Sequence, residues 1–175
     1  MDFPTQFLKF LTTYFLIFLS SSPSPTKASS KLVDSVCKET ETYNTKCQQV
    51  LGSDPRTKSV EDPNVLAEIC LQFSIANATN SLAFIKKMVQ ENNTEAIRQC
   101  EASYEAVVAS FKSALGELKE DPLTSNYDIL IAADNADACE NELAKGGGQV
   151  PSISARNDGV KLFSRIGFVI TNMLS

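Results

Sequence analysis

The stretch TEAIRQCEASYEAVVASFKSALGEL, residues 94–118, decides the fold class of this 175-residue chain. Its apolar side chains recur every three or four residues, at Ile97, Cys100, Tyr104, Val107, Phe111, Leu115 and Leu118. That spacing places them along one side of an α-helix, as in a helix with a single buried stripe. We expect Asn92 to cap this helix, with Glu95 three residues later as in a capping box.

Three further segments repeat the helical spacing. A helix is predicted after Asp62-Pro63, with aspartate as its N-cap and proline in its first turn, ending near Val89. Its expected buried side chains are Leu66, Ile69, Phe73, Ala76, Ala83 and Phe84. Another helix should span residues 125–144 and stop at the glycines 146–148, and the last should begin near Asn157. Four amphipathic helices with short connections predict an all-α fold, a four-helix up-down-up-down bundle.

Before the bundle, the stretch VCKETETYNTKC, residues 36–47, places Cys37 and Cys47 around a polar run. Residues 31–51 are expected to form two short helices that bend back at ETET, with Gly52 ending the second helix. The two cysteines lie symmetrically about Thr42, where this helical hairpin should bend. The pair could be a metal clip, a redox couple or a disulfide, and the compartment of the chain decides among these.

The N-terminal residues indicate that compartment. The apolar run FLKFLTTYFLIFL, residues 7–19, is shorter than the about 20 residues that a membrane-spanning helix needs. A Ser- and Pro-rich stretch follows, and the small residues Thr26 and Ala28 favour cleavage after Ala28. We interpret residues 1–28 as a secretory signal peptide, with an uncleaved anchor as the alternative. Residues 29–175 would then form one secreted domain.

Five cysteines in a secreted chain predict disulfides, with an odd thiol left over. The chain has no histidine and no C-x-x-C pair, so we expect no zinc site. With 1.5 Å of rise per residue, the bundle places Cys70, Cys100 and Cys139 at heights of roughly 30, 10 and 17 Å. A disulfide needs Cα atoms within about 7 Å, so Cys100–Cys139 is the best-placed pair. The predicted bridges are Cys37–Cys47 and Cys100–Cys139, and Cys70 is expected to be a buried free thiol.

Composition argues against several functions. Without Lys9, Lys27 and Asp2 of the signal peptide, 14 basic and 20 acidic residues remain, a net charge of −6. This charge disfavours nucleic acid and anionic membranes as partners. The lack of histidine excludes Ser-His and Cys-His nucleophiles, and no G-x-S-x-G or phosphate-binding glycine loop is present. We therefore expect a protein that is not an enzyme and has no cofactor, with a carboxylate-pair glycosidase as a remote alternative.

Two sequons for N-linked glycosylation occur, NAT at Asn77 and NNT at Asn92. They are meaningful because the chain is predicted to be secreted. Asn92 lies in a predicted turn and is the more accessible of the two. Asn77 lies in the middle of a predicted helix, where a glycan would need an outward face.

Four segments carry a family resemblance: VCKETETYNTKCQQVLGSDPRT, CEASYEAVVASFKSALGEL from Cys100, NYDILIAADNADACENEL with Cys139, and RIGFVITNML. Together they resemble the plant invertase/pectin methylesterase inhibitor family. The four cysteines of that family fall on the two pairs predicted above, and Cys70 stands outside the pattern. The resemblance implies a secreted helical bundle of the cell wall or apoplast, rather than of the vacuole. It also implies a one-to-one complex with a carbohydrate enzyme and no membrane attachment after signal cleavage.

The resemblance leaves the target enzyme open. Invertase inhibitors of the family resemble one another at a loop reading Asp-Pro-Lys-Phe, where this chain has Asp121-Pro122-Leu123-Thr124. Because the Lys-Phe half is missing, we expect pectin methylesterase as the target, with invertase as the alternative. A non-inhibitory carrier or allergen-type bundle is a remote alternative. Apart from the resemblance, Asp121-Pro122 has the composition of a turn that ends the preceding helix.

Family members that block pectin methylesterase lay helix faces over its cleft, which implies contacts from the outward side of the helix at residues 94–118. The candidates there are Glu101, Ser103, Glu105, Ser110 and Lys112, together with Asp121 and Pro122 in the following loop.

Overall fold

Helices form all regular structure in the described part of the chain, residues 29–148 and 150–174 of a computed structural model. The long ones are α4 (Pro63–Glu91), α5 (Glu95–Glu117), α6 (Pro122–Lys145) and α7 (Pro151–Thr171). Before them come α2 (Lys31–Glu39), the 3₁₀ turn η1 (Glu41–Tyr43), α3 (Asn44–Leu51) and the 3₁₀ turn η2 (Pro55–Ser59). The predicted signal peptide, residues 1–28, lies outside the described residues.

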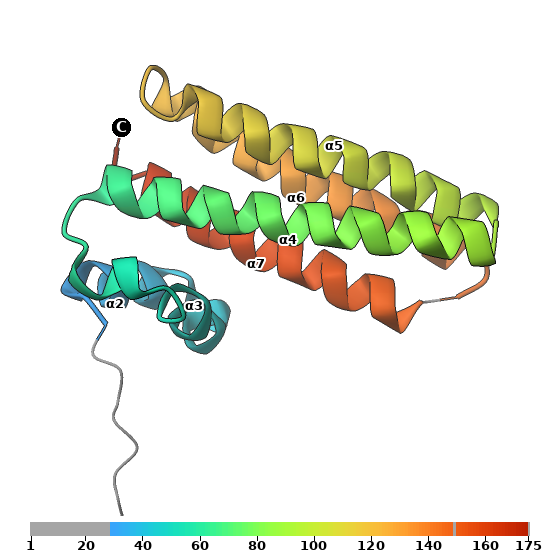
Figure 1. Ribbon diagram of the computed structural model, residues 1–175, viewed down its shortest axis with the longest axis horizontal. Coiled ribbons are helices and arrows are strands. Elements are labelled where there is room, and N and C mark those ends of the chain that lie inside the picture. The colour runs from blue at the N-terminus through green and yellow to red at the C-terminus, as the bar shows by residue number, and fades with distance from the viewer. Residues whose placement is uncertain (1–28, 149, 175) are drawn as a thin grey trace, which may run out of the picture.

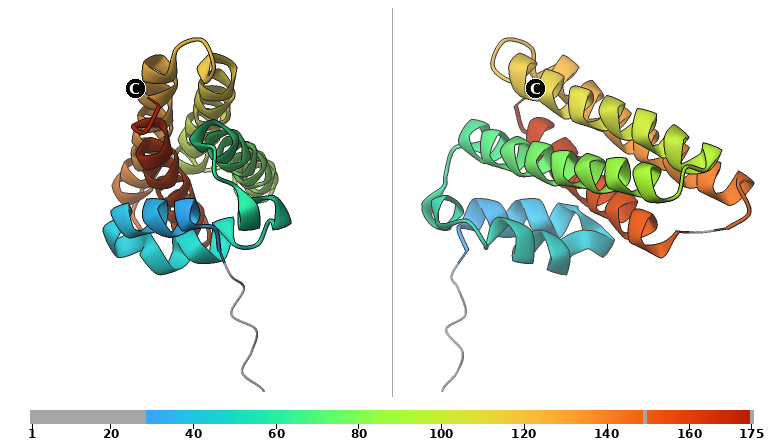
Figure 2. Two further views of the ribbon diagram at one scale, coloured as in Figure 1. Left: turned by 90° about the vertical axis from the view of Figure 1, so that its left-hand side faces the viewer. Right: turned by 45° about the vertical axis from the view of Figure 1, so that its right-hand side comes forward.

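The four long helices pack side by side in a ring. α4 contacts α5, α5 contacts α6, α6 contacts α7, and α7 contacts α4 again. Consecutive helices run in opposite directions, so the chain goes up, down, up and down (Figure 1). The hairpin of α2 and α3 lies across one side of this ring, next to α7 (Figure 2). The predicted all-α bundle with a helical hairpin before it is confirmed.

Short acidic side chains followed by proline start two of the long helices. Asp62 caps α4 as predicted, with Pro63 in the first turn. Asp121 caps α6 in the same way, and its Oδ1 accepts a hydrogen bond from the N–H of Thr124 at 3.1 Å. α6 therefore begins at Pro122, before the predicted start at residue 125. Asp121 also closes the turn that follows α5, as interpreted from the sequence, because its N–H donates to the carbonyl of Glu117 at 2.8 Å. The dipeptide therefore both ends one helix and begins the next.

The predicted cap of α5 is also wrong. Thr94 is the N-cap, and its Oγ1 accepts a hydrogen bond from the N–H of Ile97 at 3.3 Å. Asn92 is instead the C-cap of α4, and its N–H donates to the carbonyl of Met88 at 2.7 Å. Because α4 continues to Glu91, the connection to α5 is too short for a cap at Asn92.

α7 begins at Pro151, well before the predicted start near Asn157. Proline fits the first turn because its missing N–H has no helical partner there, and fully buried Ile153 extends the packed side of the helix. The predicted stop of α6 is confirmed at the glycines. Gly147 has a φ of 103°, and the N–H of Gly148 donates to the carbonyl of Leu143 at 3.3 Å, as in a Schellman motif.

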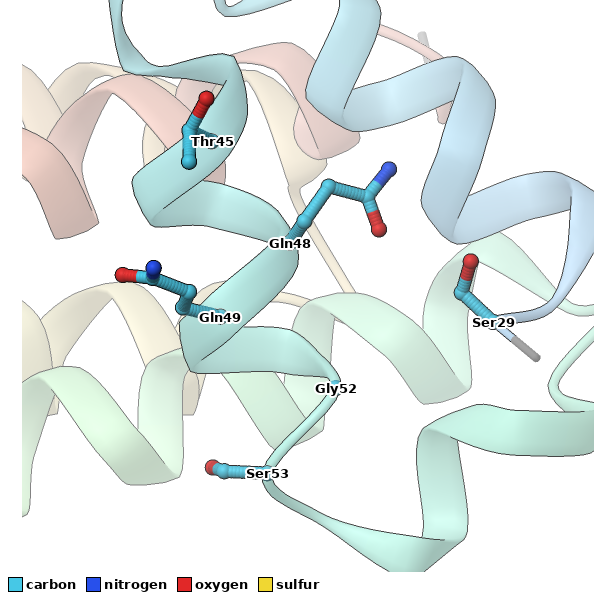
Figure 3. A pocket seen from close by; sticks show the side chains of 6 residues that line it. All are labelled: Ser29, Thr45, Gln48, Gln49, Gly52 and Ser53. Atoms are coloured by element: carbon cyan, nitrogen blue, oxygen red, sulfur yellow. The ribbon is translucent and has the colours of Figure 1, made fainter. Parts of the chain in front are cut away.

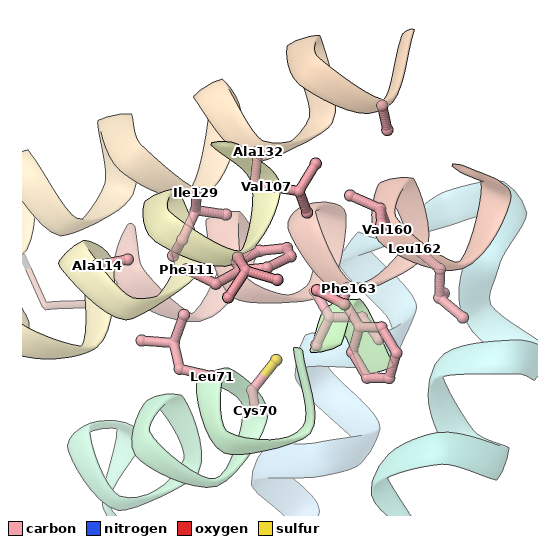
Figure 4. Packing of buried hydrophobic residues seen from close by; sticks show 14 of the residues in the cluster. Cys70, Leu71, Val107, Phe111, Ala114, Ile129, Ala132, Val160, Leu162 and Phe163 are labelled. Atoms are coloured by element: carbon pink, nitrogen blue, oxygen red, sulfur yellow. The ribbon is translucent and has the colours of Figure 1, made fainter. Parts of the chain in front are cut away.

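The hydrophobic core lies between the four long helices. Figure 4 shows Phe111 of α5 near its centre, with Leu71 of α4 and Ile129 of α6 around it. Phe111 is 1% exposed, and the other predicted α5 positions are buried except Leu115, which is partly buried. The stripe read from the sequence of α5 is therefore the side that faces the core.

The buried side of α4 differs from the prediction. Ala76 and Ala83 are exposed, and Phe73 and Phe84 are only partly buried. Leu66 and Ile69 are buried as predicted. Further along the helix, the buried positions are Cys70, Leu71, Ser74, Ala78, Ser81 and Ile85. A serine can be buried here because its hydroxyl bonds within the helix, as Ser74 does by donating to the carbonyl of Cys70 at 2.9 Å.

A buried polar chain joins α5, α6 and α7. The Tyr104 hydroxyl donates to Oδ1 of Asn157 at 2.8 Å, and both side chains are buried. Nδ2 of Asn157 donates to Oε2 of Glu140 at 2.7 Å, and the Ser154 hydroxyl donates to Oε1 of Glu140 at 2.8 Å. Burial raises the pKa of Tyr104 above its ordinary value, so the phenol stays protonated and remains a donor.

Two disulfides link neighbouring helices. Cys37 and Cys47 join α2 to α3 with 5.4 Å between their Cα atoms, and Cys100 and Cys139 join α5 to α6 with 4.4 Å. These are the two pairs expected from the sequence. Cys70 is a free thiol, fully buried in α4, and burial raises its pKa to about 12. Because the thiolate is the reactive form, this cysteine is chemically inert in the folded protein.

Candidate functional site

The hollow in Figure 3 lies beside α3 and the first described residue, Ser29. It is lined by Ser29, Thr45, Gln48, Gln49, Gly52 and Ser53. These residues are neutral, so the hollow offers hydrogen bonds but no acid–base pair. Across residues 29–148 and 150–174, no group of three or more His, Cys, Asp or Glu side chains could hold a metal ion. The outer helix faces are therefore stronger candidates for binding a partner.

The candidate residues of α5 do not form one face. Glu101 and Glu105 lie on the flank toward α4, where their carboxylates are 4.0 and 2.9 Å from Nζ of Lys86. The hydrogen bond from Lys86 to Glu105 raises the pKa of Lys86 above its ordinary value. Both ends of the nearer pair are about half exposed, so the pair adds little to stability.

Ser103 and Ser110 lie on the opposite flank of α5, toward α6, and are partly buried. Lys112 is exposed on the α4 side. Directly opposite the buried stripe, after Glu95 and Arg98 in the first turns, helical spacing places small side chains, namely Ala102, Ala106, Ala109, Ser113 and Gly116. The expectation of one polar outward face on α5 is thus corrected to two polar flanks separated by a row of small residues.

Asp121 and Pro122 lie at the start of α6. Besides capping through Oδ1, Asp121 accepts a hydrogen bond on Oδ2 from the Thr124 hydroxyl at 2.7 Å. These hydrogen bonds lower the pKa of Asp121 below its ordinary value. The segment that aligns with the invertase-inhibitor loop is therefore a fixed first turn of a helix. Leu123 projects from that turn with 71% of its surface exposed.

Leu123 begins a feature that sequence reasoning missed. Leu123, Tyr127 and Leu130 are 71%, 62% and 40% exposed and follow one another on the outward side of α6. We call these three residues the apolar row. In the described chain, the exposed large apolar side chains are Val65, Leu123, Tyr127, Leu130 and Met173, so the row holds most of them. The signal was present in the sequence as a second apolar spacing, offset from the buried positions Ile129, Ala132 and Ala136.

An exposed apolar row of this kind is typical of a protein-binding surface. Adjacent exposed apolar side chains are disfavoured in water and often mark sites where another protein binds. Tyrosine is enriched at such sites because it offers a large apolar ring and a polar tip at a small entropic cost. The row lies on a helix fixed by the Cys100–Cys139 disulfide and by packing, so little conformational freedom would be lost on binding.

A disulfide-linked helical bundle with an exposed apolar row on a rigid helix has the surface features that are common in protein-binding proteins. The family model for plant invertase/pectin methylesterase inhibitor matches residues 31–169, and the chain belongs to this family. Members of the family are inhibitors of invertases or of pectin methylesterases.

Solved structures share the fold. A mutant form A of a pectin methylesterase inhibitor from Arabidopsis is similar with a TM-score of 0.72 and 22% identity, covering 82% of this chain and 97% of that chain. A pectin methylesterase inhibitor from Arabidopsis thaliana is similar with a TM-score of 0.62 and 22% identity, covering 83% of this chain and 97% of that chain. A comparison with curated proteins gave no match. Nowhere in residues 29–148 and 150–174 is there a helix with the length and apolarity to cross a membrane.

Proposed function

We propose that this protein inhibits a pectin methylesterase by forming a one-to-one complex in the cell wall, after secretion and removal of residues 1–28. Family membership supports an inhibitor, and the two similar Arabidopsis structures are pectin methylesterase inhibitors. The observation that carries the choice of surface is the apolar row on α6.

The proposed contact surface extends from the apolar row toward α5. Asp121 and Pro122 lie immediately before the row, and Ser103 and Ser110 lie on the flank of α5 that faces α6. These polar groups would surround an apolar centre, which is the usual arrangement of a protein interface. Glu101, Glu105 and Lys112 lie on the far flank of α5 and would contact only a partner that spans the helix.

Invertase remains the second candidate target, because the family includes inhibitors of both enzymes. The position of the invertase-inhibitor loop is occupied here by exposed Leu123 and by Thr124, whose hydroxyl donates to Asp121. Neither position carries the lysine or the aromatic ring of the invertase-inhibitor loop. This arrangement favours pectin methylesterase.

The proposal is tested by titrating the purified secreted protein against a pectin methylesterase and an acid invertase. We expect stoichiometric loss of pectin methylesterase activity only. Tyr127→Ala should raise the inhibition constant about tenfold or more, because truncating a central aromatic residue of an interface costs well over 1 kcal/mol. Asn141→Ala is the matched control, since Asn141 is exposed on the same side of α6 about 21 Å further along the helix.

Each other result has a distinct meaning. Inhibition of invertase alone would move the target to invertase. Inhibition of pectin methylesterase that is unchanged in Tyr127→Ala, but lost when the charges of Glu101 and Glu105 are reversed, would move the surface to the outer flank of α5. Inhibition of neither enzyme would reject the proposed function.

A further inference from the structure

We propose that Asn92 carries an N-linked glycan in the secreted protein and that Asn77 does not, although both stand in complete sequons. This inference requires passage through the secretory pathway, but it does not depend on which enzyme is the target. It follows from how the two asparagine side chains lie in the bundle.

The surroundings of Asn92 are open. It is the C-cap of α4 with φ −145° and ψ 86°, and it is exposed together with Asn93 and Thr94. Its capping role uses the backbone N–H, which donates to Met88. Within the described residues, no hydrogen bond engages the Asn92 side chain, in contrast to Asn93, whose Oδ1 accepts from Arg98 at 2.7 Å. A sugar attached to Nδ2 of Asn92 therefore displaces no existing contact.

The surroundings of Asn77 are more confined, and its side chain is partly buried. This residue lies in the middle of α4, and its Oδ1 is buried without a hydrogen-bond partner. The amide faces Gly159 of α7, where Oδ1 and Nδ2 lie 3.4 and 3.9 Å from the position that a Cβ would occupy. Nδ2, the atom that would carry the sugar, lies beside the same glycine, so a glycan would start next to α7.

A glycan on Asn77 would begin at the seam between α4 and α7. That seam also contains Arg156 of α7, whose Nη1 donates to the Ser81 hydroxyl at 3.4 Å and whose guanidinium lies 4.0 Å from the centre of the Phe84 ring. A sugar ring there would separate the two helices and remove these contacts. We therefore expect a chain modified at Asn77 to pack α4 against α7 poorly.

Asn92 and the apolar row lie at opposite ends of the bundle. Asn92 lies in the turn between α4 and α5, and the apolar row begins after the turn between α5 and α6, at the opposite end of the bundle (Figure 1). The length of α5 separates the two turns by about 35 Å. A glycan on Asn92 would thus leave the apolar row uncovered.

The test expresses the full chain, with its own N-terminus, in a plant or yeast secretion host. Intact mass and peptide mapping, with and without enzymatic release of N-glycans, are measured for the wild type, Asn92→Gln and Asn77→Gln. We expect one glycan on the wild type, the same glycan on Asn77→Gln and none on Asn92→Gln. Thermal unfolding of Asn77→Gln verifies that its bundle is intact.

Three results would overturn the proposal: a glycan at Asn77 in folded secreted protein, a secreted wild type without any glycan, or a chain that does not reach the medium. The last result would remove the premise of secretion. Inhibition of pectin methylesterase could still be tested by the titration described above, with protein that has been refolded with its disulfides formed.

Discussion

Removing the hydroxyl of Tyr104 should lower the free energy of unfolding by about 1–3 kcal/mol. In Tyr104→Phe the ring keeps its place in the core, but Oδ1 of Asn157 loses its donor at 2.8 Å. Asn157 is 1% exposed, so water cannot easily take the place of that donor. A buried acceptor left without a partner costs about 1–3 kcal/mol, and loss of an ordinary exposed hydroxyl costs much less.

The assay is urea unfolding with both disulfides intact, followed by far-ultraviolet circular dichroism and analysed by linear extrapolation. Tyr127→Phe is the matched control, because it removes the same hydroxyl from a ring that is 62% exposed. We expect its free energy of unfolding to stay within about 0.5 kcal/mol of the wild type. If Tyr104→Phe behaves like this control, with an unchanged dependence on urea, the buried polar chain contributes nothing and the reasoning is refuted.

Three further outcomes are expected. Phe111→Ala should lower the free energy of unfolding by about 3–5 kcal/mol in the same assay, and a loss below about 1 kcal/mol would mean that this side of α5 is not the core. Cys70 should react with an alkylating reagent only under denaturing conditions, and labelling of the native protein would contradict its burial. The lowered pKa of Asp121 means that its capping contribution is complete above its ordinary pKa and is lost as pH falls through the lowered value. Thr124→Ala should raise that pKa toward its ordinary value in a carboxyl NMR titration, because it removes the largest cause of the shift.

Sequence periodicity was sufficient to predict the buried side of a helix where the core is marked by large apolar side chains. The stripe of α5 is of this kind, and the helix, its neighbours and the Cys100–Cys139 bridge followed from it by simple geometry. On α4, periodicity placed Leu66 and Ile69 correctly in the core but missed the middle of the helix, where Ser74, Ala78 and Ser81 are buried. Small side chains bury little apolar area each, so the nearby Phe73 and Phe84, which are only partly buried, were selected in their place.

The proposed contact surface was harder to predict for a related reason. Leu123, Tyr127 and Leu130 look like core residues in the sequence, and only the position of α6 in the ring shows that they point outward. The charged candidates on α5 were selected as exposed, but two of them pair with Lys86 across the seam with α4. Such pairing depends on which helix lies alongside, and spacing within one helix contains no information about that neighbour.

The seam between α4 and α7 has a consequence for the order in which the chain folds. Three sides of the ring join helices that follow one another in sequence, and contacts between near neighbours form at a small cost in loop entropy. The fourth side joins the first and last long helices, so it requires the largest loop to close and should form last. Substitutions at Asn77, Gly159 or Arg156 should therefore accelerate unfolding while leaving the rate of folding almost unchanged. The lifetime of the native bundle is then controlled by this one seam, which neither disulfide crosses.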